Sequence, residues 1–258
     1  MKRLFFWTVI LCCAVGASAQ DRFVAPQRST PQRAAQSLII SNYLQPDGLP
    51  ARDALTALSG VTFADSTAFE LFQAPTTLNG VSVWVDEIPQ PIRSVTPSQV
   101  VFILTRLGVR STVRVRTQFG TEFSAPLRGT GIWPGVLING EPDSPTAQNF
   151  IPLAIYVWGE MVAPVTNDPI PVGQQIPTAV MLHGSGWRNA TPGQIKVRLN
   201  GIECRVTGTA PHPLWIGIDA VTFEIPAYLA GNGAMDVTIY FGNRESNFAR
   251  VYLGDAIQ

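Results

Sequence analysis

The residues that could do chemistry begin with the two histidines of the 258-residue chain, His183 and His212. His183 opens the segment His183-Gly184-Ser185-Gly186, which brings a serine close to a candidate base. This segment lacks the first glycine of the G-x-S-x-G nucleophile elbow of hydrolases. A matching segment in the first half, Ser59-Gly60-Val61-Thr62, has neither the histidine nor the equivalent serine. We therefore expect a glycine-rich strand exit, no catalytic residues, and a protein that is not an enzyme.

Metal and cofactor sites find little support in the sequence. The two histidines are isolated, and His212 lies between two prolines, so no zinc site of standard spacing is present. Glu141 and Asp143 share a loop but lack the regular Asp/Asn spacing of a calcium loop, which indicates solvated turn residues. Cys204 lies in the strand-like segment 203–207 and is predicted to be a small core residue. No metal or cofactor is predicted.

Tryptophans are the best candidates for ligand contacts. Trp133, Trp158 and Trp215 lie in or near predicted loops of the second half and could form a platform for sugar rings or a protein partner. The alternative is structural: Trp187 and Trp215 would fill the ends of a sandwich, while Trp133 and Trp158 would seal an interface between two modules.

The first residues predict export. Residues 1–19 combine a basic start, a short apolar run and an Ala-Ser-Ala cleavage site, as in a secretory signal peptide. A lipoprotein signal is the competing interpretation because of Cys12 and Cys13, but neither follows a small residue. Residues 20–35, rich in Gln, Arg and Pro, are predicted to be a mobile linker. Cleavage would leave no membrane span and would place the protein outside the cell or in the envelope, the periplasm included.

Charge and cysteine content restrict the classes of partner and the sources of stability that we expect. The cleaved chain would carry 16 basic and 18 acidic residues, a balance that argues against nucleic acid as a partner. A single cysteine, Cys204, would remain, so no internal disulfide can form and stability must come from core packing. The predicted partner is an unknown protein or polysaccharide at the cell surface.

The chain contains an internal repeat. Residues 57–63 match residues 181–187, and residues 112–116 match residues 236–240, both at an offset of 124. Two further matches have other offsets: residues 81–85 match 195–199, and residues 101–104 match 222–225. Strands that persist while loop lengths drift are typical of a duplicated module. The chain is thus predicted to be all-β, with two tandem immunoglobulin-like sandwiches at residues 36–129 and 130–258.

Alternating side chains locate one pair of strands in each module. Val81, Val83 and Val85 share one face, and the strand at 112–116 alternates in the same way. If these are the C and F strands of a sandwich, Trp84 would face Arg116. In the second module Arg198 would face Tyr240, which repeats the aromatic–guanidinium pair with its partners exchanged.

Three segments carry a family resemblance: residues 38–48, an opening strand with a Pro/Gly exit; residues 79–92, a hairpin; and residues 95–102, the segment that follows it. Together they resemble the uncharacterised tandem module at the C-termini of secreted acidobacterial-type proteins, which is akin to IPT/TIG immunoglobulin-like domains. This sequence departs from that pattern at Asp86-Glu87, where Asn-Gly is usual, and at Pro97-Ser98-Gln99. The resemblance implies extracellular placement and no catalytic residues.

These observations predict a non-enzymatic secreted or cell-surface module that acts as a spacer, an adhesin-like unit or an assembly component. Two alternatives remain. A carbohydrate-binding protein would use the loop tryptophans gathered on one surface. A secreted hydrolase would need His183 or His212 within hydrogen-bond reach of a serine and a carboxylate.

Overall fold

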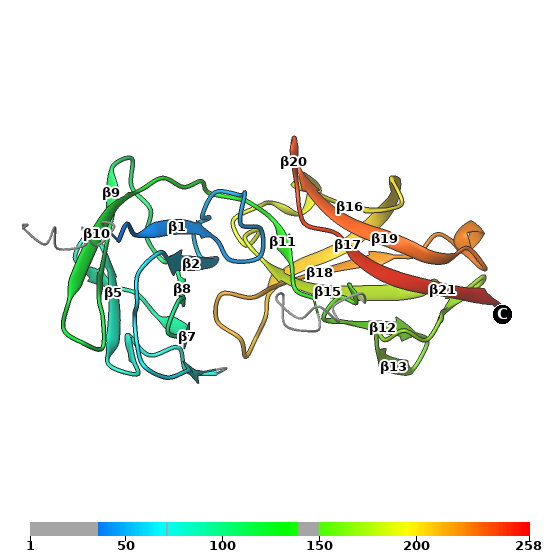
Figure 1. Ribbon diagram of the computed structural model, residues 1–258. Helices are drawn as coiled ribbons and strands as arrows, with labels where there is room; N and C mark the ends of the chain where they lie inside the picture. The colour runs from blue at the N-terminus through cyan, green and yellow to red at the C-terminus, as the bar shows by residue number, and fades with distance from the viewer. Residues whose placement is uncertain (1–35, 71, 139–149) are drawn as a thin grey trace, which may run out of the picture. The chain divides into compact units, whose positions relative to one another are not determined.

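The computed structural model describes residues 36–70, 72–138 and 150–258, and these form β-strands joined by loops and two short 3-10 turns (Figure 1). The predicted signal peptide, the predicted linker, and the loop residues Glu141 and Asp143 lie outside the described residues. The all-β prediction is confirmed. No helix in the described part of the chain is long and apolar enough to span a membrane.

Strand pairing divides the described chain into two sets of strands. The first set runs from residue 39 to residue 127 and contains β1 (Ile39–Asn42), β2 (Leu55–Ser59), β3 (Ala68–Phe69), β4 (Thr77–Leu78), β5 (Val81–Val85), β6 (Ile88–Pro89), β7 (Ile92–Val95), β8 (Val100–Ile103), β9 (Ser111–Arg116) and β10 (Glu122–Leu127). The second set runs from residue 135 to residue 257 and contains β11 (Gly135–Val136), β12 (Ala154–Trp158), β13 (Met161–Pro164), β14 (Ile170–Gly173), β15 (Ala179–Ser185), β16 (Ile195–Leu199), β17 (Ile202–Pro211), β18 (Asp219–Glu224), β19 (Gly233–Phe241), β20 (Arg244–Glu245) and β21 (Ala249–Ile257). The 3-10 turns are η1 (Pro192–Gln194) and η2 (Ala227–Leu229). Residues 36–258 as a whole form one compact unit, and the domain boundary between residues 129 and 130 stays a prediction.

The first set forms a two-layer sandwich. One sheet has the order β1-β2-β8-β7-β3 and the other has the order β10-β9-β5-β4. A single apolar cluster draws side chains from both layers, including Leu58 and Phe102 from one and Val83 and Val115 from the other. The alternation along β5 follows from this placement, since Val81, Val83 and Val85 are buried and the residues between them are half-buried.

In the second set, strands from β13 to β14 are hydrogen-bonded, each to the next, in one continuous sheet that folds over its own core. β17 is the connection: its residue Cys204 pairs with β16, whereas Arg205 onward pairs with β18, after which a bulge follows Val206. A bulge bends a strand and increases its twist, which lets one strand serve both layers. β14 closes the path by pairing parallel to β21, as the edge strand does in immunoglobulin-like sandwiches.

The internal repeat extends to strand register. Leu58 pairs with Val100 in the first set, and their counterparts Leu182 and Val221 pair in the second. In the other layer Val83 pairs with Val115, as Val197 pairs with Ile239. In β5, β9 and β16 buried residues alternate with more exposed ones, so a one-residue slip would move every apolar side chain to the wrong side.

The expected pair of Trp84 and Arg116 is wrong by one position on that face. Trp84 lies directly opposite Arg114, whose guanidinium carbon is 4.4 Å from the ring centroid, while Arg116 lies opposite Ser82. A shift of two residues keeps the same faces, so alternation alone could not decide between the two arginines. The predicted contact of Arg198 with Tyr240 is confirmed at 4.5 Å.

The hairpin turn at Asp86-Glu87 keeps the backbone of an Asn-Gly turn without the glycine. Both residues have positive φ, 48° and 64°, which matches the type I′ geometry of two-residue hairpins. The Asp86 carboxylate accepts hydrogen bonds from the Thr112 N–H and, with a smaller effect, the Ser111 hydroxyl, and both lower its pKa. Glu87 pairs with Arg114. These contacts stabilise the turn against the strain of two left-handed residues.

Candidate functional site

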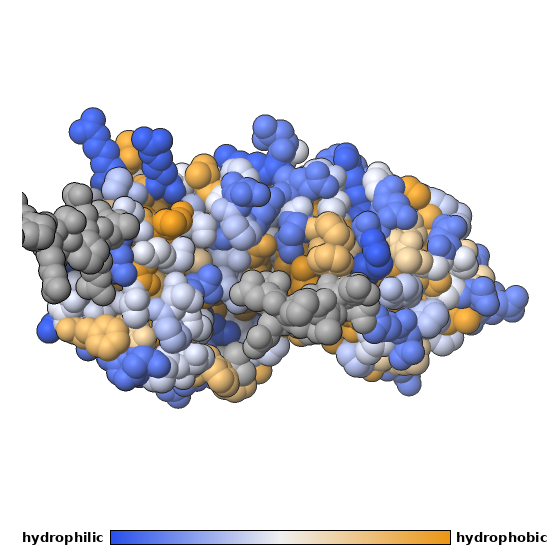
Figure 2. Space-filling view, viewed as in Figure 1, coloured by the Kyte–Doolittle hydropathy of each residue, from blue (hydrophilic) through white to orange (hydrophobic). Residues whose placement is uncertain are grey.

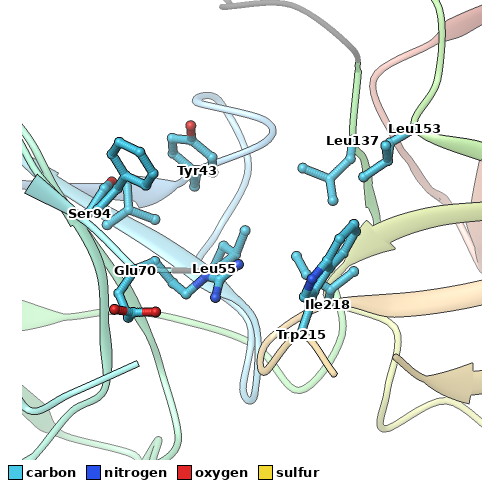
Figure 3. A pocket seen from close by; sticks show the side chains of 11 residues that line it. Tyr43, Leu55, Glu70, Ser94, Leu137, Leu153, Trp215 and Ile218 are labelled. Atoms are coloured by element: carbon cyan, nitrogen blue, oxygen red, sulfur yellow. The ribbon is translucent and has the colours of Figure 1, made fainter. Parts of the chain in front are cut away.

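A concave feature of the described structure lies where the two sets of strands meet. It is a cavity of about 400 Å³ with a mostly apolar wall. Figure 3 shows Tyr43, Leu55, Glu70 and Ser94 of the first set on one side, and Leu137, Leu153, Trp215 and Ile218 on the other. Its volume is in the range of small-molecule sites, and its few polar groups, among them Glu70, are on the first-set side. Elsewhere, on the face shown in Figure 2, hydrophobic residues are scattered among hydrophilic ones.

An apolar cluster next to this cavity joins the two sets of strands. Leu55, Val101 and Ile103 from the first set pack with Ile218 from the second, and Trp215 lies against them. Gly217 makes this approach possible: a Cβ there would lie 2.8 Å from Cγ1 of Ile103. Its φ of +81° also favours glycine. We call this contact region the junction.

Hydrogen bonds also connect the two sets of strands, some of them buried and others exposed. The Ser185 hydroxyl donates to the Gly217 carbonyl at 2.7 Å and accepts the Leu55 N–H at 2.9 Å. Arg52 and Asn189 exchange two hydrogen bonds, one from the Arg52 guanidinium to the Asn189 carbonyl oxygen and one from the Asn189 amide to the Arg52 carbonyl. Ser185, which the sequence places in a hydrolase-like segment, therefore uses its hydroxyl to connect the two sets of strands.

The two histidines meet beside Trp215, which lines the cavity. His183 on β15 and His212 after β17 have ring centroids 5.1 Å apart in an edge-to-face arrangement. Trp215 stacks on His212, with centroids 4.4 Å apart and planes 16° apart. The proximity of the two histidines could not be found from the sequence, because it depends on β18 pairing with both β15 and β17.

The hydrogen bonds of the histidines define their protonation. The Nδ1 atom of His183 faces the Leu153 carbonyl at 3.1 Å, so Nδ1 carries the hydrogen. The Nδ1 atom of His212 accepts the N–H groups of Leu214 and Trp215 at 3.2 and 3.0 Å, so it carries none. Burial lowers the pKa of both rings, and the neighbouring His212 lowers that of His183 further. These bonds all go to main-chain atoms, unlike those of a serine–histidine–carboxylate triad.

A buried carboxylate that the sequence analysis missed fixes the turn after β15. Asp219 is fully buried, and its Oδ2 accepts N–H bonds from Gly186, Trp187 and Arg188. Its Oδ1 accepts the Arg188 Nε–H at 2.8 Å. Burial raises the pKa of this carboxyl, against the opposing effect of Arg188 and the main-chain donors. No sequence pattern indicates such a site, because three of its four donors are main-chain N–H groups that lie 31 to 33 positions away along the chain.

The three candidate tryptophans have different surroundings. Trp133 is half-buried, donates from Nε1 to Gln45 at 2.8 Å and lies against Gly48 of the first set. Trp158 packs on Gly173 of the second set, where its buried Nε1 has no hydrogen-bond partner among the described residues. Trp215 lines the cavity. Trp215 therefore belongs to the junction, Trp133 contacts the first set outside that apolar cluster, and Trp158 packs within the second set. Ligand binding by the three stays a prediction.

The remaining predictions concern Cys204, Trp187 and metal binding. Cys204 is buried in the second core, as predicted, and burial raises the pKa of its thiol to about 11. Trp187 is also a core residue, as expected. Within the residues that the structure describes, no group of three or more His, Cys, Asp or Glu side chains could hold a metal ion.

Comparison with known proteins adds a distant structural likeness. No family model and no curated protein matches the chain. Among solved structures, domains 5–6 of the S-layer protein SbsC are 11% identical, with 85% of this chain and 97% of that chain covered and a TM-score of 0.24. A structure of domains 4–9 of SbsC is also 11% identical, covering 85% of this chain and 31% of that one, with a TM-score of 0.23. Scores at this level carry no argument about function.

Proposed function

We propose that the protein is a non-enzymatic secreted or cell-surface module whose two sets of strands act together as a rigid spacer or assembly unit. The observation that carries this proposal is the junction, where the Ser185 hydroxyl bonds both Gly217 and Leu55 and apolar side chains pack around it. A flexible tether between two domains would need none of these buried contacts. Export is supported by the signal-like residues 1–19.

The experiment follows the full chain through export. Expressed with its leader in a bacterial host, the protein should be cleaved before Gln20 and recovered from the envelope or the medium, as shown by N-terminal sequencing and fractionation. Recovery of an uncleaved cytoplasmic protein would contradict the proposal.

Carbohydrate binding is the second candidate, and Trp215 favours it because this ring lines a cavity of ligand size, with Tyr43 on the opposite wall. Tryptophan fluorescence of the exported protein against a panel of bacterial and plant polysaccharides tests it. A saturable change with one glycan, lost in Trp215→Ala and kept in Trp158→Ala, would put this candidate first. A flat response across the panel would favour the structural role.

A further inference from the structure

The loop from His212 to Ile218 connects the histidine pair to the junction. Main-chain bonds close the loop, from the His212 N–H to the Ile218 carbonyl at 2.9 Å and from the Ile218 N–H to the Trp215 carbonyl at 3.2 Å. At its far end Gly217 accepts the Ser185 hydroxyl, and Ile218 is a member of the junction cluster. The conformation of this loop therefore determines whether Gly217 and Ile218 of the second set can make their contacts at the junction.

His212 stabilises the loop only in its neutral form. Its Nδ1 lone pair accepts both the Leu214 and the Trp215 N–H groups, and a protonated imidazole has no lone pair to offer at that atom. Protonation would convert Nδ1 of His212 from a hydrogen-bond acceptor into a donor that faces the N–H groups of Leu214 and Trp215. The stacked Trp215 ring would then lose the support of its own N–H bond.

His183 adds a second cost to protonation. It is buried, with only 8% of its surface exposed, and its Nδ1–H is already given to the Leu153 carbonyl. A proton added at Nε2 would therefore place a buried charge 5.1 Å, centroid to centroid, from the other ring. If both rings were protonated, two like charges would face each other across this contact.

Other ionisable groups on the elements packed here do not offset these charges. Asp219 on β18 is already engaged by Arg188 and three main-chain N–H groups. Glu70 and Arg93 belong to the first-set wall of the cavity, where Trp215 stands on the opposite side. The charge that acts on His183 is that of His212 itself.

We propose that the His183–His212 pair is an acid-sensitive clasp, in which protonation of His212 opens the loop 212–218 and withdraws it from the junction. The inference rests on the geometry of the pair and does not depend on the proposed role of the protein. Burial lowers both pKa values below the ordinary 6.5, so the loop keeps its full stability above that pH. The stability is lost as the pH falls below 6.5 and through the lowered values.

Amide hydrogen exchange of the full chain, corrected for the intrinsic pH dependence of exchange, tests the clasp. Between about pH 7.5 and about pH 5, protection of the Leu214, Trp215 and Leu55 amides should fall by about tenfold or more. Each pH unit below the ordinary pKa of about 6.5 raises the ratio of protonated to neutral His212 in the opened loop about tenfold, and this favours opening. The Val197 amide on β16, inside the second core, is the internal control and should not change. Unchanged protection of the loop or of Leu55 would overturn the proposal.

His212→Asn is the matched variant. The Asn side chain places its carbonyl oxygen at the position of Nδ1, so it can accept the same two N–H groups but cannot be protonated in this range. The variant should keep its protection at about pH 5, and an acid response as large as that of the wild type would overturn the proposal.

Imidazole nitrogen spectra of the wild type provide a test that does not depend on the variant folding. The chain has only two histidines to assign. His212 should be the Nε2–H tautomer near neutral pH and should titrate below 6.5. An Nδ1–H tautomer, or a titration at or above 6.5, would contradict the clasp.

Discussion

At the scale of single residues, the side chains of the hydrolase-like types form their hydrogen bonds with main-chain groups. Histidine and serine are residue types of a hydrolase site. Here His183, His212 and Ser185 instead form hydrogen bonds with backbone atoms. The sequence could suggest that the serine segment is a strand exit, because its counterpart in the first module lacks both polar groups. It could not show that the two histidines touch, because their contact depends on long-range strand pairing.

Asp219 offers a stability test at this scale. In Asp219→Asn the amide nitrogen must face either Arg188 or the three main-chain donors, so one side of this site loses its acceptor. We expect the free energy of unfolding to fall by about 3 kcal/mol, as when one partner of a buried ion pair is removed. Urea unfolding followed by tryptophan fluorescence measures it.

The control is Asp236→Asn, which breaks a half-exposed pair with Arg250 of similar length, 2.7 Å. Because solvent screens such pairs, its cost should be below about 1 kcal/mol. Equal costs for the two variants would show that Asp219 does not have the structural role assigned to it.

At the scale of strands, the repeat predicted where matching elements lie, and the structure adds that they also pair alike. The matched segments pair with the same register in both halves, as Leu58 with Val100 and Leu182 with Val221 show. The alternation of β5 was also predictable, because a half-buried strand must place its apolar residues on one face. The choice between Arg114 and Arg116 was not, because both lie on the same face of β9.

The pairing of Trp84 can be tested by a double-mutant cycle. Alanine substitutions of Trp84 and Arg114, alone and together, should reveal a coupling energy of about 0.5–1 kcal/mol from the ring–guanidinium contact. The matched cycle of Trp84 with Arg116 should give about 0.3 kcal/mol or less, since that arginine lies opposite Ser82. A larger coupling to Arg116 would contradict the register.

Glycine substitutions test how closely the turn after β15 approaches its neighbours. Gly186 has a φ of +93°, and a Cβ there would lie 2.0 Å from the Trp133 carbonyl oxygen. Gly120 has a similar φ of +80° but open space around it. Thermal unfolding should show a cost of about 1 kcal/mol for Gly120→Ala, from backbone strain alone. Gly186→Ala should cost several times more, because the main chain itself must move. Similar costs would contradict the close approach.

At the scale of the whole molecule, the account depends on the junction. Residues 36–258 form one compact unit although no strand pairs across the two sets in the described chain. Side chains make the connection instead, through Ser185, Asn189 and the apolar cluster around Ile218. The sequence analysis expected Trp133 and Trp158 to seal an interface, and Trp133 does contact Gln45 of the first set. The expectation is wrong for Trp158, which packs on Gly173 within the second set, and Trp215 lies in the junction instead. The sequence could not identify the serine and asparagine, since neither residue type signals an interface.

The most direct test of a rigid junction is the width of a distance distribution across it. Spin labels at Thr121→Cys and Glu160→Cys occupy exposed positions on the two sets of strands, and the buried Cys204, whose pKa is raised to about 11, should stay unlabelled. Pulsed dipolar spectroscopy at neutral pH should give one narrow distance. The same labels in a Ser185→Ala, Asn189→Ala background should give a broader distribution. A broad or two-peaked distribution in the otherwise unchanged protein would contradict the rigid unit on which the proposed function depends.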